Sequence, residues 1–252
     1  MCFDPVITWS TAGLGLLTCL VAKRKKKPAT LYFAPAYFGF MEVLQGLMYT
    51  QLGASPNLFM KILVYIAYTH VCFQPLVFNH WLGSFVVPDK KSIHAFTLKL
   101  CVIGGVFMLY RAFNIPPFGG TDVPLCPEYE ALCSSTLQVY YGHHHIVWSL
   151  PLLAPGWKYA TPSIFLHMFL FFIPGSVVGL YRLCIVFFVL GPIVSAYITP
   201  NVSEQPAIWC VIGLWLLAVT VWASFSKLPK FLVPAFPPLA GQAGGTSPAP
   251  PS

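Results

Sequence analysis

The sequence predicts an all-α integral membrane protein: a bundle of about seven transmembrane helices, with its amino terminus outside the cytosol and its carboxyl terminus in the cytosol. Of the 252 residues, 57% are hydrophobic and only 8% are charged, whereas soluble domains carry roughly 25% charged residues. The apolar residues form long continuous runs, which argues against the alternating segments of about ten residues that build a β-barrel. The net charge of +7 comes mainly from one basic block and scattered lysines. It therefore indicates membrane orientation and not nucleic-acid binding.

Seven stretches are apolar and long enough to cross a hydrocarbon core of about 30 Å, which takes roughly 17–25 helical residues. They are Val6–Ala22, Ala29–Gln51, Asn57–Asn79, His94–Asn114, Thr161–Ser176, Leu180–Ile198 and Pro206–Ser226. The run from Ser163 to Ile198 would reach about 54 Å as one helix. Because that is too long for one span, Pro174-Gly175-Ser176 predicts a hairpin within it.

The basic block Lys23-Arg24-Lys25-Lys26-Lys27 sets the orientation, because such a block after a span stays in the cytosol. Threading seven spans from it places eleven of the fourteen basic residues on the cytosolic side. The positive charge follows the first apolar run, so that run is expected to be a retained anchor and not a cleaved signal peptide. We expect one transmembrane domain over residues 1–230 and a disordered cytosolic tail, rich in Pro, Gly, Ala and Ser, over residues 231–252.

Four of the eight cysteines, Cys2, Cys126, Cys133 and Cys210, fall at the predicted outer face. An even set outside the cytosol suggests disulfides, for which three connectivities can be drawn. The short spacing favours a Cys126–Cys133 bond, which leaves Cys2 to pair with Cys210. A metal site that uses Cys2, Cys210 and a nearby histidine is the alternative.

Five of the polar residues inside the predicted spans form the candidate ligand-binding set: Glu42, Gln45, His70, Gln74 and His167. A charged residue in a span costs about 2.5–3.5 kcal/mol on insertion scales, which makes it a functional candidate. At 1.5 Å per residue, Glu42 lies about 20 Å and His70 and His167 about 14 Å from the inner ends of their helices. These residues could therefore meet in one layer as a pocket for a ligand or protons. The alternatives are hydrogen-bonded struts between helices and a metal site.

A second cluster of polar and aromatic residues surrounds His143-His144-His145, before a short apolar run that ends at Leu153. At about ten residues this run is too short to span, so it is expected to be interfacial or re-entrant. An interfacial belt of aromatic and histidine residues is one interpretation. The other is a transition-metal site of iron, copper or zinc held by His70, His145 and Glu42, since two histidines and a carboxylate are a common ligand set.

Several short motifs resemble those of a family of uncharacterised polytopic membrane proteins that open with Met-Cys-Trp-Ser. The matching segments are Met1-Cys2, Met41–Gln45, His70–Pro75, His145–Trp148 and Pro206–Cys210, while Phe3-Asp4 departs from the family's Trp-Ser. The resemblance covers roughly residues 1–226. It implies a membrane fold and no activity, because the family carries a domain-of-unknown-function label. It also includes Glu42, Gln45, His70, Gln74 and His145.

The sequence contains no Walker loop, GxGxxG, HExxH or GxSxG motif, so no motif names a reaction. The leading expectation is a multi-pass membrane protein that binds or transports a small lipophilic or protonatable ligand in the Glu/His/Gln pocket. A membrane-embedded, metal-dependent oxidoreductase or hydrolase using the same residues is the second expectation. A structural subunit of a membrane complex is the third. The lipid bilayer is the expected partner in each case.

Overall fold

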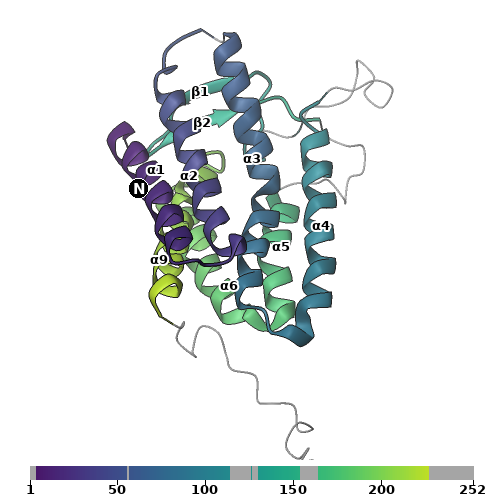
Figure 1. The fold of residues 1–252 in the computed structure, drawn as a ribbon. Coiled ribbons are helices and arrows are strands. Elements are labelled where there is room, and N and C mark those ends of the chain that lie inside the picture. The colour runs from purple at the N-terminus through teal and green to yellow at the C-terminus, as the bar shows by residue number, and fades with distance from the viewer. Residues whose placement is uncertain (1–3, 56, 114–125, 127–129, 154–163, 227–252) are drawn as a thin grey trace, which may run out of the picture.

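The computed structural model describes residues 4–55, 57–113, 126, 130–153 and 164–226. Long helices lie side by side, and a two-stranded sheet lies toward one end (Figure 1). The connection between α3 (Leu58–Leu82) and α4 (Lys91–Tyr110) lies at the opposite end. The expected tail at 231–252 and the residue Cys2 lie outside the described residues. So do the first residues of the predicted span Thr161–Ser176.

The first four helices follow the predicted spans closely: α1 covers Pro5–Arg24, α2 Ala29–Tyr49, α3 Leu58–Leu82 and α4 Lys91–Tyr110. Two of them begin at a capping residue, whose side-chain oxygen accepts a hydrogen bond from a free N–H group of the first helical turn. Asp4 accepts from the Ile7 amide at 2.9 Å, and Asn57 accepts from the Met60 amide at 2.9 Å. Two short 3-10 turns, Gly83–Phe85 and Pro88–Lys90, join α3 to α4.

The predicted hairpin between the fifth and sixth spans is confirmed. Helix α5 (Ile164–Gly175) runs into a π-helical segment (Ser176–Leu180), in which Gly179 has a φ of 94° that only glycine adopts readily. The chain then returns through α6 (Tyr181–Phe188), a second π-helical segment (Val189–Ile193) and α7 (Val194–Ile198). The rings of Phe172 and Phe188 lie 5.2 Å apart, whereas 16 residues of straight helix would separate them by about 24 Å.

The last two described helices are α8 (Gln205–Ile208) and α9 (Cys210–Phe225). Among the described residues, five segments are long and apolar enough to cross a membrane. They are Pro5–Arg24, Leu58–Phe85, Pro88–Tyr110, Phe165–Ile198 and Gln205–Phe225. Helix α2 has 21 residues, but Glu42, Gln45, three tyrosines and one proline lower its hydropathy. It packs against α1, α3 and α9.

A folded cap, which we define as Cys126 together with residues 130–153, covers one end of the helices. Its strands β1 (Gln138–Tyr141) and β2 (Ile146–Ser149) pair antiparallel, and β2 is wholly buried. The predicted disulfide Cys126–Cys133 is present, with a Cα–Cα distance of 6.2 Å. The strands were not predicted from the sequence: the apolar run after His145 forms β2 and packs into the same apolar cluster as α2, α3 and α4.

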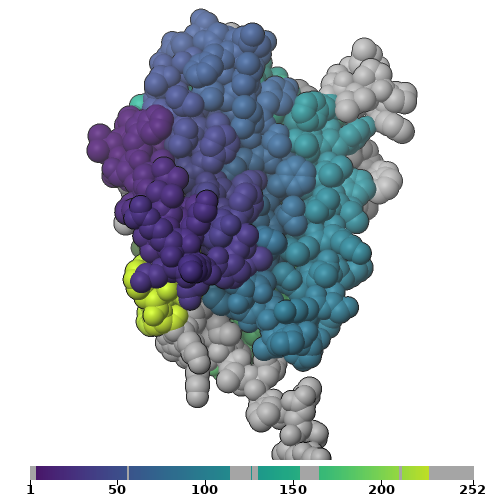
Figure 2. All heavy atoms as spheres, viewed as in Figure 1, coloured from purple at the N-terminus to yellow at the C-terminus, as the bar shows by residue number. Residues whose placement is uncertain are grey.

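The core consists of two apolar clusters, one toward each end of the bundle. The outer cluster joins the cap to α2, α3 and α4, and includes Met48, Tyr68 and Trp148. The inner cluster joins α3, α5, α6 and α9 around Phe78 and Phe187. Figure 2 shows the face of the molecule on which α1 to α4 lie next to one another. Large apolar side chains stay exposed on the helices, such as those of Phe96, Ile103 and Phe107 on α4, which suits a lipid environment.

Candidate functional site

A cavity of about 40 Å³ lies between the two apolar clusters. Residues of α1, α2, α3, α5 and α9 form its walls, and Leu132 and Trp148 of the cap close it on the outer side. Four of the five predicted ligand-binding residues line it: Glu42, Gln45, Gln74 and His167. The structure thus places side chains from three helices in one layer.

His167 is the most unusual group in this cavity. Its side chain is 1% exposed, and neither ring nitrogen has a hydrogen-bond partner among the described residues. Its ring packs between those of Phe171 and Trp209, at centroid distances of 5.7 and 5.9 Å. A buried polar group without a partner costs about 1–3 kcal/mol. A cavity of this volume has room for about three water molecules, since each needs about 10–15 Å³. Water or a ligand in the cavity would therefore satisfy the imidazole.

Glu42 and Gln45 face the cavity from α2, and both are buried, with 4% and 1% of their surface exposed. They lie three residues apart and therefore share one side of the helix, as the sequence predicted. A carboxyl group, an amide and an imidazole consequently surround a space that is otherwise lined mainly by apolar side chains.

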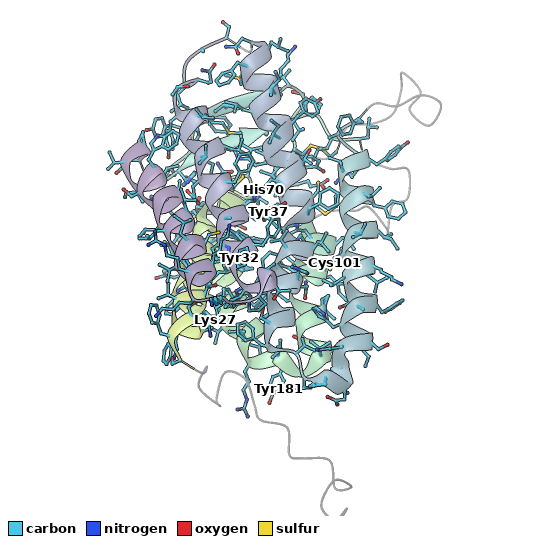
Figure 3. All side chains as sticks on the ribbon, viewed as in Figure 1. Lys27, Tyr32, Tyr37, His70, Cys101 and Tyr181 are labelled. Carbon is cyan, nitrogen blue, oxygen red and sulfur yellow. A yellow bond between two sulfur atoms is a disulfide. The ribbon has the colours of Figure 1, made fainter. Side chains whose placement is uncertain are left out.

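His70 lies behind the cavity wall and does not line it. Its Nε2 donates to the Tyr37 carbonyl at 2.8 Å, while the Tyr37 hydroxyl donates to the His70 carbonyl at 2.7 Å. The two rings stack at 3.9 Å between α2 and α3 (Figure 3). With Nε2 donating, Nδ1 is left to accept from the Gln74 amide, 3.4 Å away. His70 is thus a strut between two helices that also orients Gln74, which does reach the cavity.

The predicted metal set of His70, His145 and Glu42 is not assembled. His70 stacks on Tyr37, whereas the ring of His145 lies 6.3 Å from that of Tyr49. These contacts are twelve residues apart on α2, or about 18 Å along the helix. In the described part of the chain, no three His, Cys, Asp or Glu side chains gather as a metal site. The predicted pair Cys2–Cys210 cannot be placed, because Cys2 and the side chain of Cys210 lie outside the described residues.

Glu204, which the sequence analysis did not select, holds the cap to the bundle. It is fully buried, and its Oε1 accepts from the backbone amides of His144 and His145. Its Oε2 accepts from the Thr199 hydroxyl at 2.6 Å. Burial alone would raise the pKa of Glu204, but the bonds from Thr199 and from the histidine backbone outweigh it and lower this pKa. A Cβ on Gly142 would lie 2.6 Å from Oε1, so this close approach requires glycine.

The His143–His145 run therefore attaches the cap to the bundle through its backbone amides, which donate to Glu204. The side chain of His145 is buried and that of His143 is exposed. No metal-ligand cluster forms around these histidines among the described residues, while the interfacial belt stays a prediction. The carboxylate that accepts from these amides belongs to Glu204, about 60 residues further along the chain. No local pattern in the sequence reveals this contact.

A buried ion pair fixes the other side of the cap. The two terminal guanidinium nitrogens of Arg111, at the end of α4, donate to the carboxylate of Glu130. Nη1 donates to Oε1, and Nη2 lies 2.9 Å from Oε2. Arg111 Nε donates to the Leu153 carbonyl at 2.8 Å. Arg111 thus holds both ends of residues 130–153, whereas Glu204 holds the turn between β1 and β2. These contacts fix the part of the cap that lines the cavity.

Comparison with known proteins identifies one family. Residues 7–229 match the model of a family described as a family of unknown function, DUF5765. No curated protein and no solved structure matches the chain.

Proposed function

The chain belongs to the DUF5765 family, and we propose that it is a multi-pass membrane protein that binds or transports a small protonatable ligand in the cavity between Glu42 and His167. The proposed topology has seven spans, with the amino terminus outside and the carboxyl terminus in the cytosol. The proposal combines this orientation with a small cavity between the helices, which Glu42, Gln45, Gln74 and His167 line.

Contacts at the helix ends support the topology. Lys25, just after α1, lies over the ring of Phe225 at the end of α9, 4.6 Å from its centroid. Thr30 and Ser84 hydrogen-bond at 2.7 Å, which brings the start of α2 and the end of α3 to the same side. The basic block Lys23–Lys27 and the carboxyl-terminal end of α9 therefore lie at the same end of the bundle. The disulfide-bonded cap lies at the opposite end. Basic residues favour the cytosolic side, and disulfides form outside the cytosol.

The single observation that carries the binding proposal is the environment of His167. Membrane helices rarely hold an ionisable residue unless it faces a partner or a water-filled space. The imidazole faces a cavity that also contains Glu42, and no described residue bonds either nitrogen. The volume of about 40 Å³ is far below the roughly 300–1,000 Å³ of sites for drug-sized ligands. The ligand is therefore small and forms hydrogen bonds, and the lipophilic option is set aside.

Thermal unfolding of the detergent-purified protein with a panel of small solutes tests the proposal. The panel contains ammonium, methylammonium, formate and methanol, none of which has more than three heavy atoms. At least one solute is expected to raise the unfolding temperature of the wild type in a saturable way, because a ligand that binds only the folded state stabilises it.

Two glycine variants show whether the effect arises in the cavity. Gly213 lines the cavity, and a Cβ added there meets no heavy atom within 4 Å. Gly213→Leu is therefore expected to fill the space and abolish the shift. Gly13→Leu is the matched control, since Gly13 is exposed on α1 and equally free of contacts. A panel without any shift, or an equal shift in Gly213→Leu, contradicts the proposal.

A further inference from the structure

The charge of the cavity lining restricts the class of ligand. Among the described residues that line it, Glu42 is the only acidic side chain, and no Lys or Arg is present. The remaining polar groups include Gln45, Gln74 and His167. An anionic ligand would enter without a positive side chain to offset its loss of hydration, whereas a cation would meet the carboxylate. Since isolated buried charges are very unfavourable, the lining favours a cation.

Aromatic side chains complete the surroundings. Phe38, Trp148, Phe171 and Trp209 all line the cavity. A cation close to such ring faces is attracted by their negative charge density, most strongly when water is excluded. The combination of one carboxylate with several rings suits ammonium groups better than strongly hydrated metal ions, and no cluster of metal-ligating side chains is found among the described residues.

The free imidazole adds a hydrogen-bond acceptor. A neutral histidine always has one nitrogen that accepts, and both nitrogens of His167 are buried without a described partner. The Oε1 atoms of Gln45 and Gln74 are further acceptors by residue type. A primary ammonium group has three N–H donors, so the carboxylate, an imidazole nitrogen and an amide oxygen match its number of donors.

Volume limits the size of the cation. A cavity of about 40 Å³ holds about three water molecules, which is enough for a molecule of up to about three heavy atoms. Ammonium and methylammonium are within this limit. Tetramethylammonium, with five heavy atoms and no N–H donor, exceeds it and cannot make the hydrogen bonds.

From these four properties we infer that the cavity binds a primary ammonium ion no larger than methylammonium, with Glu42 as its counter-charge and His167 as an acceptor. This inference rests on the proposed function and specifies its ligand.

Titration of the detergent-purified full chain with methylammonium chloride tests it, with the unfolding temperature and the heat of binding as readouts. Methanol is the neutral probe of equal size, formate the anionic one, tetramethylammonium the oversized cation, and sodium chloride the control for ionic strength. We expect saturable binding of methylammonium alone. Glu42→Gln is expected to weaken this binding at least tenfold, and Gly13→Leu to leave it unchanged.

The outcomes separate the two proposals. If formate or methanol binds in the cavity and methylammonium does not, the ammonium inference is overturned while the proposed function stands. If no probe binds, both fail. Methylammonium binding that Glu42→Gln leaves within twofold of the wild type overturns the role of the carboxylate. The wild-type titrations decide the ligand class even if Glu42→Gln does not fold.

Discussion

His145 provides a quantitative test of how the cap is built. Its side chain is fully buried, Nδ1 donates to the Ile146 carbonyl at 2.7 Å, and Nε2 has no partner among the described residues. Burial lowers the pKa of His145 to about 4, although the Ile146 carbonyl and the Glu204 carboxylate act in the opposite direction. The imidazole of His145 is therefore neutral in the folded protein near pH 7.

The sign and size of the effect follow from proton linkage. Below a pH of about 6.5 the unfolded chain protonates His145 and the folded chain does not, so acid favours unfolding. The contribution of His145 to the free energy of unfolding is fully present above the pKa of the unfolded chain. It declines as the pH falls to the pKa of the folded protein, about 4. A shift from 6.5 to 4 corresponds to about 3 kcal/mol in total, of which about 2 kcal/mol is lost between pH 7 and pH 5.

Equilibrium unfolding in mixed detergent micelles at pH 7 and pH 5 measures this loss. We expect the free energy of unfolding of the wild type to fall by about 2 kcal/mol more than that of His145→Leu, which has no group to protonate. His143→Leu is the control because this neighbouring side chain is exposed, and it should follow the wild type. An equal loss in wild type and His145→Leu would refute the reasoning.

Two further predictions concern buried polar contacts and use the same unfolding assay at pH 7. Asn79 Nδ2 donates at 2.8 Å to the Leu170 carbonyl, which Pro174 cannot bond because it has no N–H. Asn79→Leu is expected to lower the free energy of unfolding by about 1–2 kcal/mol. The loss should be smaller in a Pro174→Ala background, because the alanine supplies an N–H to the Leu170 carbonyl. A double-mutant cycle that shows no coupling between the two positions contradicts this account. Glu130→Ala is expected to cost about 3–5 kcal/mol because it leaves Arg111 charged and buried, and Arg111→Met/Glu130→Leu should recover most of the loss. A stable single variant contradicts this account.

The helices were predictable because each depends on local sequence. An apolar run of sufficient length, a polar cap such as Asp4 or Asn57, and the Pro174-Gly175-Ser176 turn are all visible within a few residues. The cap was not predictable in the same way. The run Ile146–Ser149 is apolar because it packs under helix ends, and apolarity alone does not distinguish a buried strand from an interfacial segment.

The candidate site was partly predictable for a related reason. Helical rise places Glu42 and His167 in one layer, so depth in the membrane could be estimated before any contact was known. The contact of Glu204 with the His143–His145 backbone joins segments about 60 residues apart through main-chain groups that every residue has. The sequence therefore drew attention to the histidine side chains, whereas the amides make the contact.

The buried polar residues also bear on a choice that sequence alone left open, between struts and the proposed site. His70 and Asn79 are struts, because their polar atoms bond carbonyls of neighbouring helices, which is the arrangement that lipid-embedded helices need. His167 differs from both, since it has the same burial and no such bond. A histidine that stabilised packing alone would be replaced at no loss by a residue without polar atoms. Its place on a cavity shared with Glu42 is therefore the property that a binding function explains and a strut does not.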